Sequence, residues 1–295
     1  MTVRKENIKK RSGTHRKSHR CDVISIALRL AVNLAAVTTA AVLIFIIVYI
    51  LINGIPYISA DLFAWKYNSE NVSMMPAIVN TIYMIALALL FSVPVGIGSA
   101  IYLTEYAKRG NKIAACVKLT AETLSGIPSI VYGLVGQLFF VKYLHMGLSL
   151  ISGALTLAIM ILPLIMRTTE EALVAVPDSY REGSFGLGAG KLRTVFSVVL
   201  PSAVPGIISG VILAIGRIVG ESAALIFTAG TVAEAATSLL SSARTLAVHM
   251  YALSDEGLYL NQTYATAVIL LVIVIFINAL SEYTAKLLGG KTRNG

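Results

Sequence analysis

Long apolar runs without a charged residue constrain this 295-residue chain more than any other feature. They cover residues 30–60, 71–104, 123–141, 143–166, 194–216 and 257–281. Each run is near or above the roughly 20 residues that a helix needs to cross the hydrocarbon core of a membrane. Because 56% of the residues are hydrophobic and only 13% are charged, little of the chain is left for a soluble domain. The sequence predicts an all-α polytopic membrane protein with six transmembrane helices, at 24–52, 77–104, 114–142, 149–168, 202–226 and 263–288.

The net charge of +9 is distributed unevenly between the loops. Residues 1–23 form a basic tail, with Arg4, Lys5, Lys9, Lys10, Arg11, Arg16, Lys17 and Arg20. Further basic residues lie in the loops 105–118 and 169–201 and after residue 285, whereas the remaining loops hold only Lys66, Lys142 and Arg244. By the positive-inside rule, both termini and these two loops are predicted to be cytoplasmic. The tail has no interleaved aromatic residues for stacking on bases, so we expect it to lie near anionic lipid and not to bind nucleic acid.

A polar, Gly-rich segment separates the fourth and fifth predicted spans. It reads Glu182-Gly183-Ser184-Phe185-Gly186-Leu187-Gly188 and is followed by Val198-Val199-Leu200-Pro201. Pro177 ends the preceding helix, Asp178 or Ser179 is expected to cap a short new one, and the glycines permit a sharp turn. The spacing resembles the EAA loop of bacterial ATP-binding-cassette importer permeases, with Gly183 and Ser184 in place of the usual Ala-Ala. The alternative is an ordinary amphipathic loop that rests on the bilayer surface.

In those permeases the loop docks into a separate ATPase subunit, so the resemblance implies a coupling loop at 169–201. The coupling residues that it implies are Glu182, Gly183, Ser184, Gly188, Lys191, Leu200 and Pro201. An apolar face formed by Leu187, Leu192, Val195 and Phe196 would suit a groove in a partner.

Two charged residues stand inside the fifth predicted span, Arg217 and Glu221. Their spacing of four places both on one face of a helix, where they can partly neutralise each other. One interpretation is a structural pair that fixes helix packing. The other is that Arg217 offers its planar guanidinium to an oxyanion in the transport path, while Glu221 tunes or releases that contact. Arg167, at the inner end of the fourth span, is expected to reach for the headgroups or to form a second anion contact.

Signals for catalysis are missing from the sequence. His15, His19, His145 and His249 have no metal-binding spacing. The segment 186–192 superficially resembles a phosphate-binding loop, but Phe185 stands where the first Gly should be and Leu192 replaces the required Ser or Thr. We therefore expect no enzyme, no metal, no cofactor and no ATPase site in this chain, and the energy for transport is expected to come from a partner.

Two further segments, 125–133 and 216–222, together with the six-span layout, resemble the permease subunits of bacterial phosphate importers over about residues 24–290. The resemblance implies a permease domain in the bacterial cytoplasmic membrane and phosphate as the substrate, with Arg217, Glu221 and Arg167 in its path. It also implies three kinds of partner: a second permease subunit, ATPase subunits and an extracytoplasmic phosphate-binding protein. The first outer loop lacks a large insertion, which favours one of the two phosphate permease subunits over its sister. Another oxyanion and the sister role stay open.

Other classes of membrane protein fit the residues less well. A secondary transporter would show paired broken helices in two halves, and no internal repeat is visible. A membrane-embedded enzyme would need a cluster of nucleophile, base or metal ligands. A non-transporting scaffold fits the hydropathy but gives no reason for Arg217 and Glu221. The residues around 126–133 weaken the third predicted helix, either as a packing kink or as backbone that lines a cavity.

Overall fold

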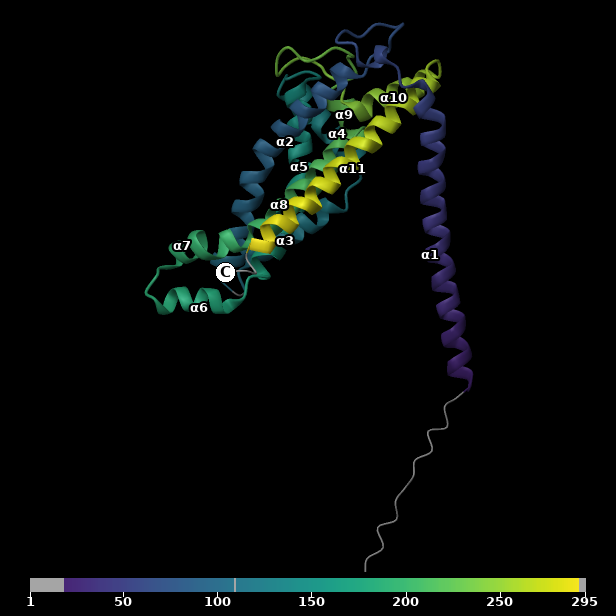
Figure 1. Ribbon diagram of the computed structural model, residues 1–295. Coiled ribbons are helices and arrows are strands. Elements are labelled where there is room, and N and C mark those ends of the chain that lie inside the picture. The colour runs from purple at the N-terminus through teal and green to yellow at the C-terminus, as the bar shows by residue number, and fades with distance from the viewer. Residues whose placement is uncertain (1–18, 109, 292–295) are drawn as a thin grey trace, which may run out of the picture. The chain divides into compact units, whose positions relative to one another are not determined.

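The structure, a computed structural model, describes residues 19–108 and 110–291, and no strand occurs among them (Figure 1). The chain divides into two compact units, residues 1–49 and 50–295. The first unit contains most of α1 (His19–Gly54), which is apolar enough over Ser25–Tyr57 to span a membrane. Most of the predicted basic tail, residues 1–18, lies outside the described residues, and residues 19–23 begin α1.

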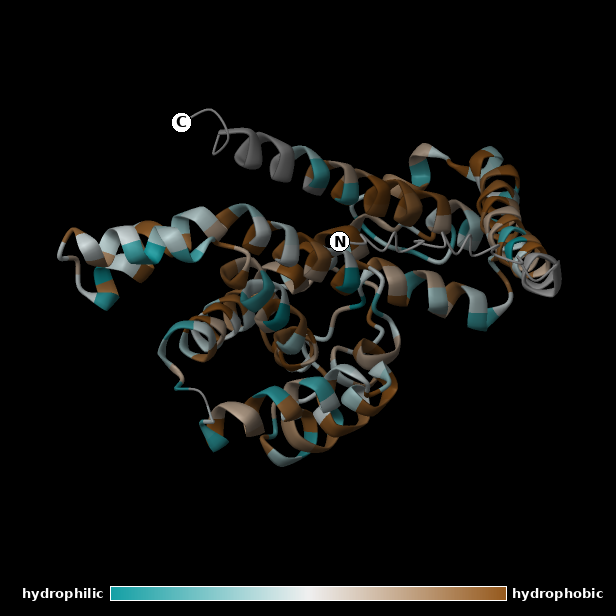
Figure 2. Ribbon diagram, turned by 90° about the horizontal axis from the view of Figure 1, so that it is seen from below, coloured by the Kyte–Doolittle hydropathy of each residue, from teal (hydrophilic) through white to brown (hydrophobic). Residues whose placement is uncertain are grey.

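The second unit supplies four more continuous candidate spans. These are α2 (Met75–Ile101) with a π-helical turn at Tyr102–Tyr106, α5 (Leu150–Val174), the stretch from α7 (Lys191–Thr194) through a π-helical segment (Val195–Val199) into α8 (Leu200–Val219), and α11 (Leu260–Lys291). Hydrophobic residues predominate along α11 up to the end drawn in grey, as Figure 2 shows. The predicted all-α membrane protein is confirmed.

The third predicted span, 114–142, is not one continuous helix. It consists of α3 (Lys112–Ser125) and of α4 (Ser129–Gly136) with its π-helical extension Gln137–Tyr143, and the two parts are bent by 105°. Pro128 adopts extended geometry (ψ 142°) immediately before α4. A proline disfavours helical geometry in the residue before it and has no backbone N–H to donate, so the helix is interrupted here. With this broken span, six segments of the described chain could cross a membrane.

The fifth predicted span, 202–226, also differs from the structure. Helix α8 ends at Val219, and a short helix, α9 (Ala223–Thr228), begins after a break at Gly220, Glu221 and Ser222. A helix that the sequence did not predict, α10 (Leu246–Glu256), follows the long loop after α9. Two short 3₁₀ turns, Ile55–Tyr57 and Ala60–Phe63, lie between α1 and α2.

The main core forms where α5 packs between α2 and α8. Leu157, Ile161 and Ile165 of α5 are fully buried there. Small residues let the backbones approach closely, as is usual between membrane helices. Gly210 of α8 faces Thr168 of α5, and a Cβ at Gly210 would collide with that side chain. Each of the three helices also has one interior proline, namely Pro94, Pro163 and Pro205.

Buried polar side chains of α2 fix the loop between α9 and α10. Asn80 is fully buried, and its amide nitrogen donates to the carbonyl oxygens of Glu234 at 2.9 Å and Arg244 at 3.2 Å. Its amide oxygen accepts from the backbone N–H of Ala236 at 2.9 Å. The Thr81 hydroxyl accepts from the N–H of Leu246 at 2.9 Å, at the start of α10. These bonds satisfy backbone groups that no regular element pairs.

Candidate functional site

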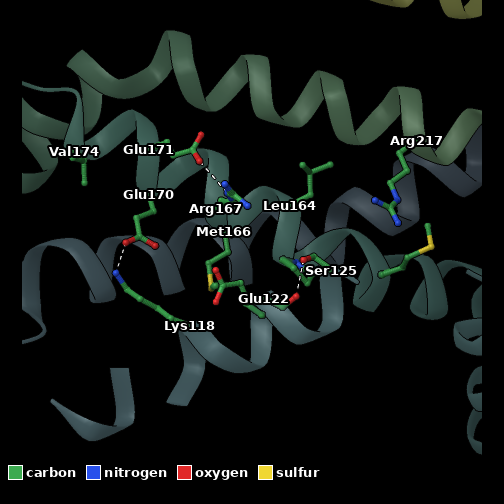
Figure 3. A pocket seen from close by; sticks show the side chains of 13 residues that line it. Lys118, Glu122, Ser125, Leu164, Met166, Arg167, Glu170, Glu171, Val174 and Arg217 are labelled. Carbon is green, nitrogen blue, oxygen red and sulfur yellow. Dashed lines mark hydrogen bonds and ion pairs between the residues drawn. The ribbon is translucent and has the colours of Figure 1, made fainter. Parts of the chain in front are cut away.

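A cavity of about 520 Å³ opens between α3, α5 and the end of α8. Ten of its lining side chains are labelled in Figure 3. Its charged lining residues are Lys118 and Glu122 from α3, Arg167, Glu170 and Glu171 from α5, and Arg217 from α8. The cavity thus brings together two of the predicted path residues, Arg167 and Arg217, although they lie on different helices.

Two of the three basic residues in the cavity are paired with carboxylates. The Lys118 ammonium group contacts the carboxylate of Glu170, across α3 and α5. The Arg167 Nε donates to Glu171 Oε1 at 3.0 Å, one turn farther along α5, and both side chains are well exposed. An exposed pair of this kind holds its partners only weakly. Arg167 lies inside α5, which continues to Val174 beyond the predicted end of the fourth span at residue 168, and an anion would have to displace Glu171 from it.

Arg217 differs from the other two basic residues of the cavity. It lies in the last turn of α8, its side chain is exposed, and among the described residues no ion pair joins it to a carboxylate. In Figure 3 it lies toward one end of the cavity, and the Lys118–Glu170 pair lies toward the other. A guanidinium group without a carboxylate partner keeps its fork of donors available for an oxyanion.

Glu221 does not form the ion pair with Arg217 that the spacing predicted. The break after Val219 removes Glu221 from the helix that carries Arg217, so the two residues no longer share one helix face. The buried Glu221 carboxylate instead accepts a hydrogen bond from the N–H of Ala224 at 3.1 Å, in the first turn of α9. A carboxylate in this position satisfies an unpaired helix N–H group and complements the positive end of the helix. Its contacts within the chain are therefore structural.

The segment that resembles the EAA loop folds as two short helices, α6 (Asp178–Gly186) and α7. They lie at the end of the second unit that is opposite to α9 and α10 (Figure 1). The predicted cap is wrong, because Pro177 precedes α6 without a side-chain cap and Asp178 lies in the first turn. The chain reverses at Gly188, whose φ of +80° favours glycine. The Ser184 hydroxyl lies 2.9 Å from the Thr194 hydroxyl and joins α6 to α7.

The outward surface of this loop is apolar at its tip. Leu187 is 92% exposed, and Phe185 and Leu192 are also exposed, as are the charged Glu182 and Lys191. Leu200 and Pro201, the last two residues of the predicted motif, begin α8, where Leu200 packs on the core next to Val199. The predicted coupling residues thus fall into an exposed group at the loop tip and a group that anchors the loop to the bundle.

Several contacts of the cavity and of the α6–α7 loop have no signal in the sequence. In the sequence, Lys118 contributes only to the basic loop that predicts the cytoplasmic side. In the structure it lines the cavity and pairs with Glu170. Arg181 and Glu105 form a partly buried ion pair between α6 and the end of α2. Their separation of 76 residues leaves no local pattern to detect.

The chain matches the protein family described as "Binding-protein-dependent transport system inner membrane component" over residues 92–294. A probable ABC transporter permease protein of Bacillus subtilis, YqgI, is 35% identical over 241 residues, which are 77% of this chain and 82% of that protein. The phosphate transport system permease protein PstC of Mesorhizobium japonicum is 30% identical over 267 residues, 81% of this chain and 80% of that protein. The permease protein PstA 2 of Mycobacterium bovis is 40% identical over 154 residues, 52% of this chain and 50% of that protein.

Solved structures of similar fold are also transporters. A chain of a bacterial alginate ABC transporter superposes with a TM-score of 0.62 and 19% sequence identity, and covers 90% of this chain and 97% of that one. A chain of the MetNI methionine ABC transporter, in an inward-facing conformation, gives a TM-score of 0.57 at 18% identity, and covers 72% of this chain and 93% of that one. These structures show the shared fold.

Proposed function

Because the chain belongs to the family of binding-protein-dependent transport system inner membrane components, we propose that it is the permease subunit through which an ATP-driven importer moves inorganic phosphate. Membership of the family and the apolar helices make it a multi-pass protein of the inner membrane and a subunit of an ABC importer. Phosphate as the cargo is supported by relatives that are named phosphate permeases. The alternative is a permease for another oxyanion.

The observation that carries the proposal is Arg217 in the cavity, without a carboxylate partner among the described residues. A tetrahedral oxyanion accepts two parallel hydrogen bonds from a guanidinium group. The flanking Lys118 and Arg167 add positive potential, but the carboxylates of Glu170, Glu171 and Glu122 in the same lining offset it. An anion would therefore meet a single strong donor group, which suits passage better than tight retention.

The exposed tip of the α6–α7 loop supports docking to an ATPase. Leu187, Phe185 and Leu192 present apolar surface beside the charged Glu182 and Lys191, as a helix that fills a groove in a partner would. We assign the coupling role to Glu182, Gly183, Ser184, Gly188, Lys191, Leu200 and Pro201. The chain would then supply no ATPase site of its own.

The partners of the complex follow from this assignment. They are ATPase subunits of the PstB type, a second permease of the PstC type, and an extracytoplasmic phosphate-binding protein of the PstS type. The short loop between the first and second spans favours a PstA-like role for this chain, and the sister PstC-like role is the alternative. Both termini and the α6–α7 loop are assigned to the cytoplasm, where the ATPase binds ATP.

Uptake of radiolabelled inorganic phosphate tests the cargo. Cells that lack their own phosphate importers, and that express the chain with its partner subunits, should accumulate phosphate in an ATP-dependent manner. Excess unlabelled phosphate should compete, whereas sulfate should not. Competition by sulfate would favour the general oxyanion permease, and copurification with a PstA-like permease in place of a PstC-like one would favour the sister role.

A further inference from the structure

Both ends of the α6–α7 loop are attached to the same turn at the end of α2. Near the start of α6, the Arg181 Nε and Nη2 donate to Glu105 Oε1 at 3.1 and 2.7 Å. At the start of α7, the Lys191 ammonium group lies over the Tyr106 ring, 5.1 Å from its centroid. Glu105 and Tyr106 belong to the π-helical turn Tyr102–Tyr106. Such turns are rare and frequently occur at functional sites.

Arg181 also holds the end of α5. Its Nη1 donates to the Val176 carbonyl at 2.8 Å, and its Nη2 donates to the Leu173 carbonyl at 2.9 Å. The last carbonyls of a helix have no partner within the helix and attract a positive charge. One guanidinium group therefore joins three elements: the end of α2, the end of α5 and the first turn of α6.

Burial separates this contact from an ordinary surface ion pair. The side chains of Arg181 and Glu105 are only 16% and 8% exposed. Asp178, which accepts from the Arg181 Nη1 at 3.1 Å, is 88% exposed and is screened by solvent. Glu105 is thus the partner that fixes the orientation of the guanidinium group.

The joined elements lead directly to the cavity. Helix α2 packs along α5, and α5 carries the cavity residues Arg167, Glu170 and Glu171. We propose that Arg181 and Glu105 are positioning residues that transmit movement of the α6–α7 loop to the helices lining the cavity. This inference rests on the proposed function, in which the loop docks on an ATPase.

A double-mutant cycle tests the proposal in the assembled complex, reconstituted in vesicles with its ATPase and binding protein. The variants are Arg181→Gln, Glu105→Gln and both together, with Asp178→Asn as a comparison that neutralises only the exposed carboxylate. Uptake of inorganic phosphate and ATP hydrolysis are both measured per assembled complex. We expect each single variant to lose about tenfold in uptake while ATP hydrolysis persists, and the double variant to be no worse than the poorer single one, as for residues that act through one contact. Asp178→Asn should lose much less.

Three outcomes would overturn the proposal. Uptake per assembled complex could stay at the wild-type value, the two losses could multiply in the double variant, or even the conservative Arg181→Lys variant could yield no assembled complex, which would make the contact a folding element. Gly188→Val distinguishes these results from a failure of the docking role. If Gly188→Val abolishes uptake while the Arg181 and Glu105 variants retain it, docking stands and only the transmission route fails.

Discussion

Replacing Arg217 separates a role in anion passage from a role in packing. We expect Arg217→Gln to abolish phosphate uptake with little loss of assembled complex. Among the described residues no carboxylate pairs with the exposed guanidinium group, so its removal leaves no buried charge without a partner. Arg217→Lys should keep part of the activity, since it retains the charge without the planar fork. Uptake and copurification of the partner subunits measure the two effects.

The control for this prediction is Glu221. Glu221→Gln keeps an oxygen that can accept from the N–H of Ala224, so we expect assembly and most of the transport to survive. The double variant, Arg217→Gln with Glu221→Gln, should assemble and remain inactive. A double variant that transports phosphate normally would reduce Arg217 to a packing element.

His249 makes the stability of α10 dependent on pH. It is fully buried, burial lowers the pKa of its imidazole to about 3, and the positive charge of Arg244 acts in the same direction, while the Val72 backbone opposes both. Tyr67 lies between the two, 4.6 Å from the Arg244 guanidinium and 6.2 Å from the imidazole by ring centroid. Because the unfolded imidazole has a pKa of about 6.5, the folded state is favoured fully above that pH.

Between about pH 6.5 and pH 3, only the unfolded chain takes up the proton. The free energy of unfolding should therefore fall in this range by up to about 1.4 kcal/mol per pH unit. Thermal unfolding of the purified complex at several pH values measures this slope. His249→Gln should remove that part of the slope and lower the stability near neutral pH. The exposed His145→Asn is the comparison, and an equal change of slope in both variants would contradict the assignment to His249.

At the scale of elements, Gly188 is the residue on which the reversal between α6 and α7 depends. Its φ of +80° strains any β-branched side chain, by roughly 1–2 kcal/mol, although no heavy atom lies within 4 Å of the position that a Cβ would take. We expect Gly188→Val to uncouple ATP hydrolysis from uptake while the protein stays inserted in the membrane. Glu182→Lys, which reverses a charge on the same surface, should have a similar effect.

Gly186→Ala is the matched control for this prediction, since Gly186 also has open space and has no positive φ. Normal uptake in both Gly188→Val and Glu182→Lys would reject the docking role of the loop.

The lengths of apolar runs located the membrane helices but not their interruptions. The run 123–141 continues through Pro128 and the predicted span 202–226 continues through Gly220, because hydropathy alone does not register a bend. The Gly and Pro residues near 126–133 did indicate a weakened third helix. The break after Val219 had only Gly220 as a signal, and it separated the predicted ion pair. Helix α10 has a mixed composition, and the loop before it is fixed by Asn80, which lies 164 residues from Arg244 along the chain. Such contacts have no local pattern.

The grouping of charged residues in the cavity could not be predicted from the sequence either, because it depends on contacts between residues far apart in the chain. The sequence indicates Arg217 because a charge inside a predicted span is conspicuous, and Arg167 because it ends an apolar run. That they meet Lys118 and Glu170 depends on the bend between α3 and α4 and on the packing of α5. Tyr57, Phe63 and Trp65, in the loop before α2, are exposed, whereas Tyr67 of the same loop packs on Arg244.

At the scale of the whole molecule, the distribution of Lys and Arg predicts which surface faces the cytoplasm. In a background in which Cys21 and Cys116 are replaced by serine, a cysteine at Gly188 should resist a membrane-impermeant thiol reagent in intact cells. A cysteine at Leu258, which is 81% exposed between α10 and α11, should react. Labelling at Gly188 and protection at Leu258 would invert the proposed orientation.

The interior prolines of α2, α5 and α8 determine how stiff the bundle is along its length. Each proline lacks the N–H that would bond the carbonyl four residues earlier, so each helix has one position at which bending is opposed by one hydrogen bond fewer. Pro94, Pro163 and Pro205 lie within the candidate membrane spans, and Pro163 also lines the cavity beside Arg167. A force applied at either end of the bundle would therefore bend α2, α5 and α8 at these prolines. The helical segments on either side of each proline would move as rigid bodies.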